Sequence, residues 1–123
     1  MAHKILIVDD EPNIVISLEF LLKKEGFEIA LAGDGDEALA QVAAFNPDLV
    51  LLDVMMPKKS GYEVCEILRA DPQHGGLLIL MLTAKGRDTE VAKGLAIGAD
   101  AYMTKPFSTK ELIAKVKHLL GVV

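Results

Sequence analysis

Five short apolar runs, separated by longer segments of helical periodicity, constrain the fold of this chain more than any other feature. Several runs are apolar without alternation, which is typical of strands covered by helices on both faces of a parallel sheet. They begin about 25 residues apart, as βα units do. The runs are Ile5–Val8, Phe27–Ala32, Leu49–Leu52, Leu77–Leu82 and Ala101–Thr104.

The segments between the runs carry apolar stripes and the signals that begin and end helices. Ser60 and Ser108 each stand three residues before a Glu, which is a capping-box pattern. We therefore expect five helices around a five-stranded parallel sheet, an α/β fold. The stripes are Ile14, Leu18, Leu21 and Leu22; Ala38, Leu39, Val42 and Phe45; Val64, Ile67 and Leu68; Val91 and Leu95; and Leu112, Val116 and Leu119.

Length and composition favour one globular domain over residues 1–123, with no visible output domain. The net charge of −5 argues against nonspecific nucleic-acid binding, which needs clustered positive charge. Cys65 is the single cysteine, which fits a reducing compartment. We find no signal peptide and no apolar run long enough to span a membrane, so we expect a soluble, cytoplasmic protein.

Polar side chains follow four of the five apolar runs, at the point where each predicted strand ends. Asp9 and Asp10 follow the first run, Asp53 the third, Thr83 the fourth and Lys105 the fifth. Because ligands of open α/β sheets bind outside the carboxyl ends of the strands, we expect these side chains to share one edge. Taken singly, the acidic pair could cap a helix, Asp53 or Thr83 could serve a turn, and Lys105 could be solvated.

The chemistry of this set points to phosphoryl transfer. Three clustered carboxylates repel one another, and a divalent cation relieves that repulsion. Mg²⁺ prefers oxygen ligands and often binds carboxylates together with a phosphate. Lys105 supplies a cation for a phosphoryl oxygen, Thr83 a hydrogen-bond donor, and an aspartate can itself be the nucleophile. We interpret Gly35 and Gly61 as backbone devices, since the chain has no phosphate-cradling glycine motif.

In order and spacing, these residues resemble the receiver domains of two-component signalling over essentially the whole chain. That resemblance implies a (βα)5, flavodoxin-like fold with strand order 2-1-3-4-5. The markers are Ile5 to Glu11, Pro47-Asp48 through Asp53 to Pro57, Gly61, Leu82-Thr83-Ala84, Gly98-Ala99-Asp100 and Tyr102 to Phe107.

The resemblance implies a role for each residue of the metal site. Asp53 matches the phosphoacceptor, and Asp9 and Asp10 match the acidic pair that holds Mg²⁺ with it. Met55 matches the position whose backbone carbonyl completes the metal site. In the connection after Asp53, Lys59 stands where Leu or Met is common, which leaves the local packing of that connection open.

The resemblance also implies a switch. Thr83 and Lys105 match the switch hydroxyl and the phosphate-binding lysine, and Tyr102 matches the aromatic residue that changes rotamer. The alternative is that Tyr102 is simply a strand aromatic packed against a helix. A cis Lys105–Pro106 bond is expected, and Lys85 and Met55 are expected to tune the phosphoryl lifetime.

The implied function is a phosphorylation-dependent switch that catalyses only its own phosphorylation and dephosphorylation. Its donor would be a sensor histidine kinase or phosphotransfer protein. The signal would leave through the face of the fourth helix, fifth strand and fifth helix, to a protein target or an output domain, from a monomer or a phosphorylation-dependent dimer.

Three other functions stay open at this stage. One is a Mg²⁺-dependent phosphatase with an aspartate nucleophile, but such enzymes commonly have a second Asp where Met55 stands. Another is a flavin binder, but the clustered acids are poorly suited to an anionic flavin phosphate. A degenerate receiver that only binds would lack part of this site.

Overall fold

The computed structural model describes residues 3–54, 59–84, 97–105 and 107–121. Five strands form one sheet in the order β2-β1-β3-β4-β5, and every neighbouring pair is parallel. This confirms the α/β class and the strand order implied by the resemblance. The strands are β1 (Lys4–Val8), β2 (Glu28–Ala32), β3 (Leu49–Asp53), β4 (Leu78–Ala84) and β5 (Ala101–Lys105).

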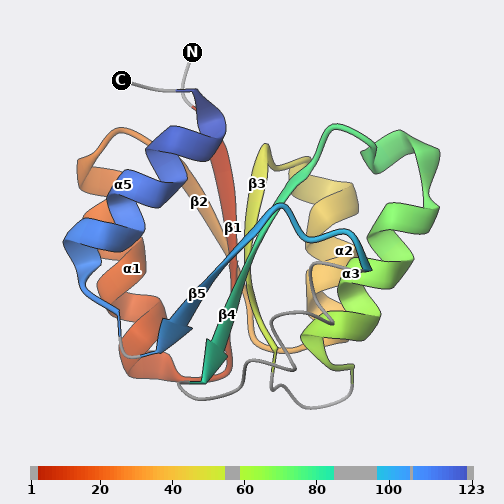
Figure 1. The fold of residues 1–123 in the computed structure, drawn as a ribbon, viewed down its shortest axis with the longest axis horizontal. Coiled ribbons are helices and arrows are strands. Elements are labelled where there is room, and N and C mark those ends of the chain that lie inside the picture. The colour runs from red at the N-terminus through yellow and green to blue at the C-terminus, as the bar shows by residue number, and fades with distance from the viewer. Residues whose placement is uncertain (1–2, 55–58, 85–96, 106, 122–123) are drawn as a thin grey trace.

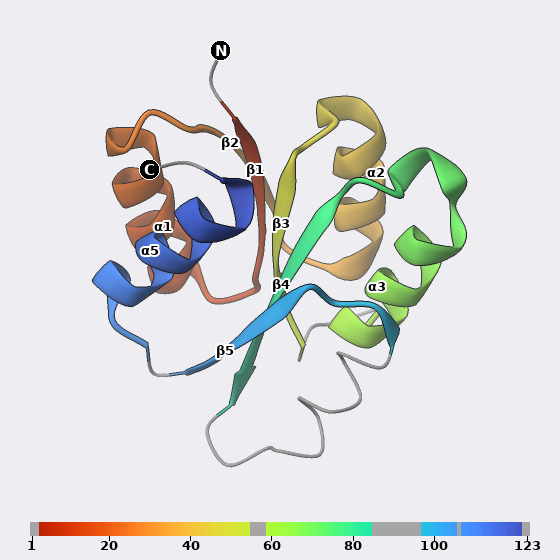
Figure 2. The ribbon, with the colours of Figure 1, turned by 45° about the horizontal axis from the view of Figure 1, so that its top comes forward.

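Four α-helices cover the sheet within the described residues, two on each face. Figures 1 and 2 show α1 and α5 on one side of the strands and α2 and α3 on the other. The helix expected from Val91 and Leu95 falls on residues 85–96, outside the described residues. The helices are α1 (Pro12–Lys24), α2 (Gly35–Phe45), α3 (Gly61–Ala70) and α5 (Thr109–Leu120), with a 3-10 turn η1 (Pro72–His74) before β4.

The central strands are buried on both faces, which is why their sequences do not alternate. In β1, Ile5 and Ile7 pack in the core layer under α1 and α5, whereas Leu6 and Val8 pack in the layer under α2 and α3. None of these four side chains is exposed to solvent. In the described part of the chain, no helix combines the length and the apolar character that crossing a membrane requires.

Local hydrogen bonds fix the starts of three helices and confirm the capping residues read from the sequence. The Ser60 hydroxyl accepts from the Glu63 amide, and the Glu63 side chain accepts from the Ser60 amide, so this capping box is complete. The Ser108 hydroxyl likewise accepts from the Glu111 amide at 3.0 Å. At α2 the cap is Asp34, which the sequence analysis did not identify.

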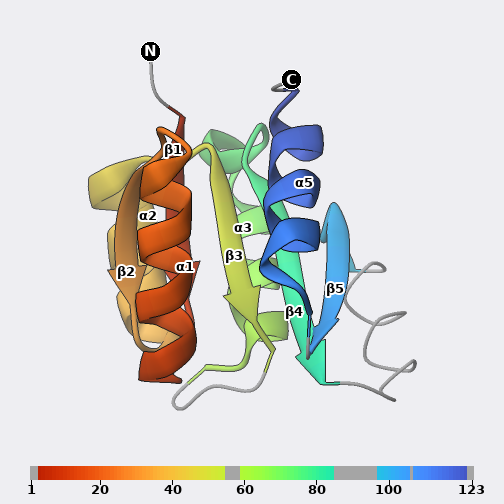
Figure 3. The ribbon, with the colours of Figure 1, turned by 90° about the vertical axis from the view of Figure 1, so that its left-hand side faces the viewer.

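The parallel arrangement places the carboxyl ends of the strands at one edge of the sheet. Figure 3 shows the arrowheads of β2, β3, β4 and β5 at the same lower edge, with the end of α5 at the opposite edge. Side chains that end different strands therefore meet here.

Candidate functional site

Three carboxylates converge at the carboxyl edge of the two central strands. Asp53 ends β3, and Asp9 directly follows β1, whose Val8 pairs with Leu52. Oxygen atoms of Asp9, Asp10 and Asp53, one from each, lie within 4.8 Å of one another. Asp9 and Asp53 are buried and Asp10 is exposed, so this acidic cluster opens to solvent on one side. Clustered carboxylate oxygens are a donor set that suits Mg²⁺.

Asp9 is held through both carboxylate oxygens. Its Oδ1 accepts a hydrogen bond from the Glu11 amide at 2.9 Å, and its Oδ2 accepts from Lys105 Nζ at 3.0 Å. The first bond belongs to the turn that leads from β1 into α1, so the local chain and a distant strand orient the same carboxylate.

Lys105, the last residue of β5, brings its ammonium into the acidic cluster. Its Nζ lies 3.0 Å from Asp9, 3.2 Å from Glu11 and 3.6 Å from Asp53. Partial burial works to lower the pKa of Lys105, but the hydrogen bond to Asp9 and the charges of Asp53 and Asp9 outweigh it. The pKa therefore lies above its ordinary value, and the group is a cation at neutral pH.

Thr83 supplies a buried hydroxyl from β4, the strand beside β3. The residue is 1% exposed, and its Oγ1 has no hydrogen-bond partner among the described residues. A buried hydroxyl without a partner costs about 1–3 kcal/mol. An oxygen-rich group arriving at Asp53 would relieve that cost, so this orphaned donor fits a phosphoryl ligand.

Gly61 lets the start of α3 approach the end of β3. A Cβ added at Gly61 would lie 2.4 Å from the carbonyl oxygen of Asp53 and 2.9 Å from Cα of Val54. The Gly61 amide also donates to the Val54 carbonyl at 2.9 Å. The interpretation of Gly61 as a backbone device agrees with this geometry.

The structure brings most of the predicted site residues together, and several of the others fall outside the residues it describes. Asp9, Asp10, Asp53 and Lys105 lie together, and Thr83 lies buried near the end of the neighbouring strand β4. The remaining predicted residues that fall outside the described residues are Met55, Lys85 and Pro106.

Glu11 accepts a hydrogen bond from Lys105 Nζ at 3.2 Å, a contact that was not predicted from the sequence. Its only signal is its place directly after two aspartates at a strand end.

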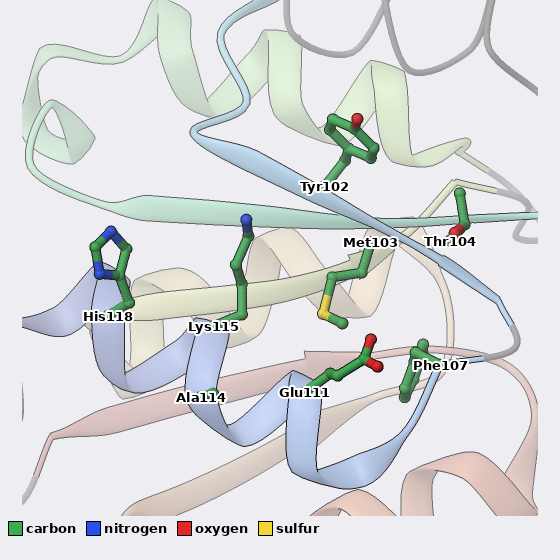
Figure 4. Close-up of a pocket in the computed structure, with 8 residues that line it drawn as sticks. All are labelled: Tyr102, Met103, Thr104, Phe107, Glu111, Ala114, Lys115 and His118. Atoms are coloured by element: carbon green, nitrogen blue, oxygen red, sulfur yellow. The ribbon is translucent and has the colours of Figure 1, made fainter.

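Tyr102 lies on the outer part of the sheet, away from the acidic cluster. It is 43% exposed. Tyr102 and Met103 leave β5 on opposite sides (Figure 4), as alternation along a strand requires. A shallow groove lies between β5 and α5, and its lining includes Tyr102, Phe107, Glu111, Lys115 and His118.

At its carboxyl edge the parallel sheet carries an acidic cluster, a lysine ammonium and a buried hydroxyl, which are the groups that phosphoryl transfer to a carboxylate needs. Residues 5–117 match the family described as the response regulator receiver domain. The chain belongs to that family, which provides the phosphorylation-dependent switch of two-component signalling. Receiver domains of this family bind Mg²⁺ in the active site.

Individual relatives agree with this assignment. The chain is 49% identical over 120 residues to the DNA-binding response regulator MtrA of Mycolicibacterium smegmatis, covering 98% of this chain and 51% of MtrA. It therefore spans about half the length of the curated relatives it matches.

Solved structures show the same fold. The chemotaxis response regulator CheY4 of Vibrio cholerae superimposes with a TM-score of 0.91 at 32% identity, covering 97% of this chain and 99% of that one. The receiver domain of the sensor histidine kinase PA1611 from Pseudomonas aeruginosa has a TM-score of 0.88 at 27% identity, covering 98% and 99%. That structure holds a magnesium ion in its active-site cleft.

Proposed function

We propose that residues 1–123 form one receiver domain in which Asp53 accepts the phosphoryl group. Asp9, Asp10 and Asp53, together with the backbone carbonyl of Met55, would hold Mg²⁺. The observation that carries the proposal is the convergence of the buried Asp53 with a second buried carboxylate and a lysine ammonium. When bound, Mg²⁺ neutralises charge on the phosphoryl oxygens and helps to align the transfer.

The residues divide the work of the transfer among them. A carboxylate oxygen of Asp53 attacks phosphorus and forms the new P–O bond. The bond from phosphorus to the donor nitrogen of a phosphohistidine breaks, and its electron pair stays on that nitrogen. Lys105 Nζ, 3.6 Å from Asp53 Oδ1, is within reach of an incoming phosphoryl oxygen. The Thr83 hydroxyl would donate to another phosphoryl oxygen and so gain the partner it lacks.

We further propose that the same hydroxyl switches the output face. Movement of Thr83 toward the phosphoryl group would open space that the ring of Tyr102 fills, so Tyr102 would exchange an exposed for a buried rotamer. The half-exposed Tyr102 and the groove between β5 and α5 support an output face made of β5, α5 and the fourth helix expected from the sequence.

The partners follow from this chemistry. The donor would be a sensor histidine kinase or a phosphotransfer protein, and the signal would pass to a protein target or an output domain. This chain would contact neither nucleic acid nor membrane directly. It would work in the cytoplasm, as a monomer or a phosphorylation-dependent dimer, and catalyse only its own phosphorylation and dephosphorylation.

Intact mass spectrometry tests the phosphoacceptor. With acetyl phosphate and Mg²⁺, the chain should gain one phosphoryl group, and chelation of the metal should slow the gain. Asp53→Asn should gain none. Asp48→Asn is the matched control, because Asp48 precedes the same strand at the opposite edge and accepts from the Lys4 amide. An Asp53→Asn chain that gains the adduct at the parent rate contradicts the proposal.

Amide chemical shifts test the switch, with beryllofluoride standing in for the phosphoryl group. The shifts should spread from Asp53 to Thr83, Tyr102 and residues 88–97. In Thr83→Ala they should stay near Asp53. Shifts confined to that region in the parent chain, or an unchanged reach in Thr83→Ala, contradict the coupling.

A further inference from the structure

Lys59, two residues before α3, lies against the first turn of α2, in a contact that involves no residue of the acidic cluster. A Cβ added at Gly35 would lie 2.4 Å from Cβ of Lys59 and 2.7 Å from its carbonyl oxygen. Both are positions close to the main chain, so a larger residue at 35 would displace the backbone of Lys59. Glycine at the start of α2 is therefore what allows the two segments to touch.

An ion pair joins the same two segments. Lys59 Nζ lies 3.0 Å from Asp36 Oδ1, and Asp36 follows Gly35 in the first turn of α2. The hydrogen bond to Asp36 and its charge hold the pKa of Lys59 above the ordinary value. The side chains are 34% and 52% exposed, so the pair is weak by itself. Its significance is its position beside the Gly35 contact.

The two contacts act close to Asp53 along the chain. Gly61 donates to the Val54 carbonyl, which fixes the start of α3 against the end of β3. Lys59 stands two residues before Gly61 and six after Asp53. A displacement of Lys59 would therefore be transmitted through Ser60 and Gly61 to the Val54 carbonyl, next to Asp53.

We propose that Gly35 and the Asp36–Lys59 pair form an anchor that positions Lys59 and the start of α3 against the end of β3, and that this α2 anchor sets Mg²⁺ affinity and phosphorylation rate. The inference rests on the proposed function of Asp53 and adds positioning residues to it. None of the three residues belongs to the acidic cluster, so they would act through the backbone they hold.

Two variants that change the charge in opposite directions distinguish the anchor from a through-space effect of charge on Mg²⁺ binding. Lys59→Met removes a positive charge, and a through-space effect alone would strengthen Mg²⁺ binding. Asp36→Asn removes a negative charge, and a through-space effect alone would weaken it. Loss of the anchor is common to both variants, so the anchor predicts weaker binding in both, roughly two- to fivefold for each. The double variant should bind Mg²⁺ no more weakly than whichever single variant binds it more weakly.

The steric contact between Gly35 and Lys59 gives a second, independent test of the anchor with a matched control variant. Gly35→Ala should weaken Mg²⁺ binding more than either charge variant, because the backbone of Lys59 must move. Gly33→Ala should match the parent chain, since its Cβ would meet only Glu37 Oε2, at 3.6 Å. Glu19→Gln controls for loss of an exposed ion pair, because it breaks the 3.0 Å bridge to Lys23 on α1.

The experiment measures Mg²⁺ affinity from amide shifts, the rate of phosphorylation by acetyl phosphate, and metal-free hydrogen exchange at the Ser60 amide. The anchor predicts weaker affinity, slower phosphorylation and faster exchange in Gly35→Ala, Asp36→Asn and Lys59→Met, with both controls at parent values. Folded variants with parent affinity, or charge variants that move in opposite directions, overturn the anchor. A parent chain that takes no phosphoryl group on Asp53 contradicts the proposed function instead.

Discussion

Adding Mg²⁺ should stabilise the unphosphorylated fold, because the proposed metal site is the acidic cluster of the native state and the unfolded chain lacks it. At a free concentration about 100 times its dissociation constant, such a ligand adds about 2.7 kcal/mol. Unfolding 123 residues at about 2.1 cal/mol/K per residue gives an entropy near 0.26 kcal/mol/K. The melting temperature should therefore rise by about 10 °C.

Neutralising Asp10 should change the metal-free and metal-bound stabilities in opposite directions. Asp10 is the exposed member of a cluster whose oxygens lie within 4.8 Å. Two unit charges at about 4 Å repel by about 1 kcal/mol in water. Asp10→Asn should therefore raise the metal-free melting temperature by up to about 4 °C. It should also remove most of the Mg²⁺ response, because the proposed metal site loses one of its three carboxylates.

Differential scanning fluorimetry at low ionic strength measures both effects, with Mg²⁺ titrated against Na⁺ at matched ionic strength. Glu66→Gln is the control, since Glu66 is an exposed carboxylate on α3 and lies outside the acidic cluster. A melting temperature indifferent to Mg²⁺ would refute the reasoning. So would an Asp10→Asn chain that responds to Mg²⁺ as the parent does.

Three further substitutions give distinct outcomes. Thr83→Val should leave urea stability unchanged or higher, because it removes an unpartnered buried hydroxyl, yet it should shorten the reach of beryllofluoride shifts. Lys105→Met should lower the free energy of unfolding by about 1–3 kcal/mol, because the buried Asp9 loses its cation. Since the folded pKa of Lys105 is raised, that loss should be constant from pH 7 to 9 and shrink above about pH 10.4, in urea melts. Gly61→Ala should lower the free energy of unfolding by about 1–3 kcal/mol, because its Cβ would lie 2.4 Å from the Asp53 carbonyl oxygen. A variant as stable as the parent would contradict this steric clash.

The fold was predictable because local and periodic signals agree. Uninterrupted apolar runs such as Leu49–Leu52 mark strands buried on both faces, and the serine caps mark where helices begin. The order of the strands came from the resemblance, since periodicity does not say which strands are neighbours. The 3-10 turn η1 was not predicted, because its only sequence signal is Asp71 followed by Pro72. In the structure the Asp71 carboxylate accepts a hydrogen bond from the Gln73 amide and so begins the turn.

The candidate site was predictable to the extent that strand ends reveal it. Asp9, Asp53 and Lys105 end parallel strands and therefore share an edge. Side-chain pairing across the sequence was not predictable in the same way. Arg69 donates to the Gly98 carbonyl and pairs with Asp100, about thirty residues away. The partner that Lys59 finds in Asp36 is similarly a product of the fold, because many acidic residues were available to it.

Reductive trapping tests the central claim most directly. Borohydride reduces an aspartyl phosphate to homoserine, which peptide mapping by mass spectrometry locates along the chain. After incubation with acetyl phosphate and Mg²⁺, homoserine should replace Asp53 and no other aspartate. Homoserine at Asp9 or Asp10, or a phosphorylated chain that yields none, would contradict Asp53 as the phosphoacceptor.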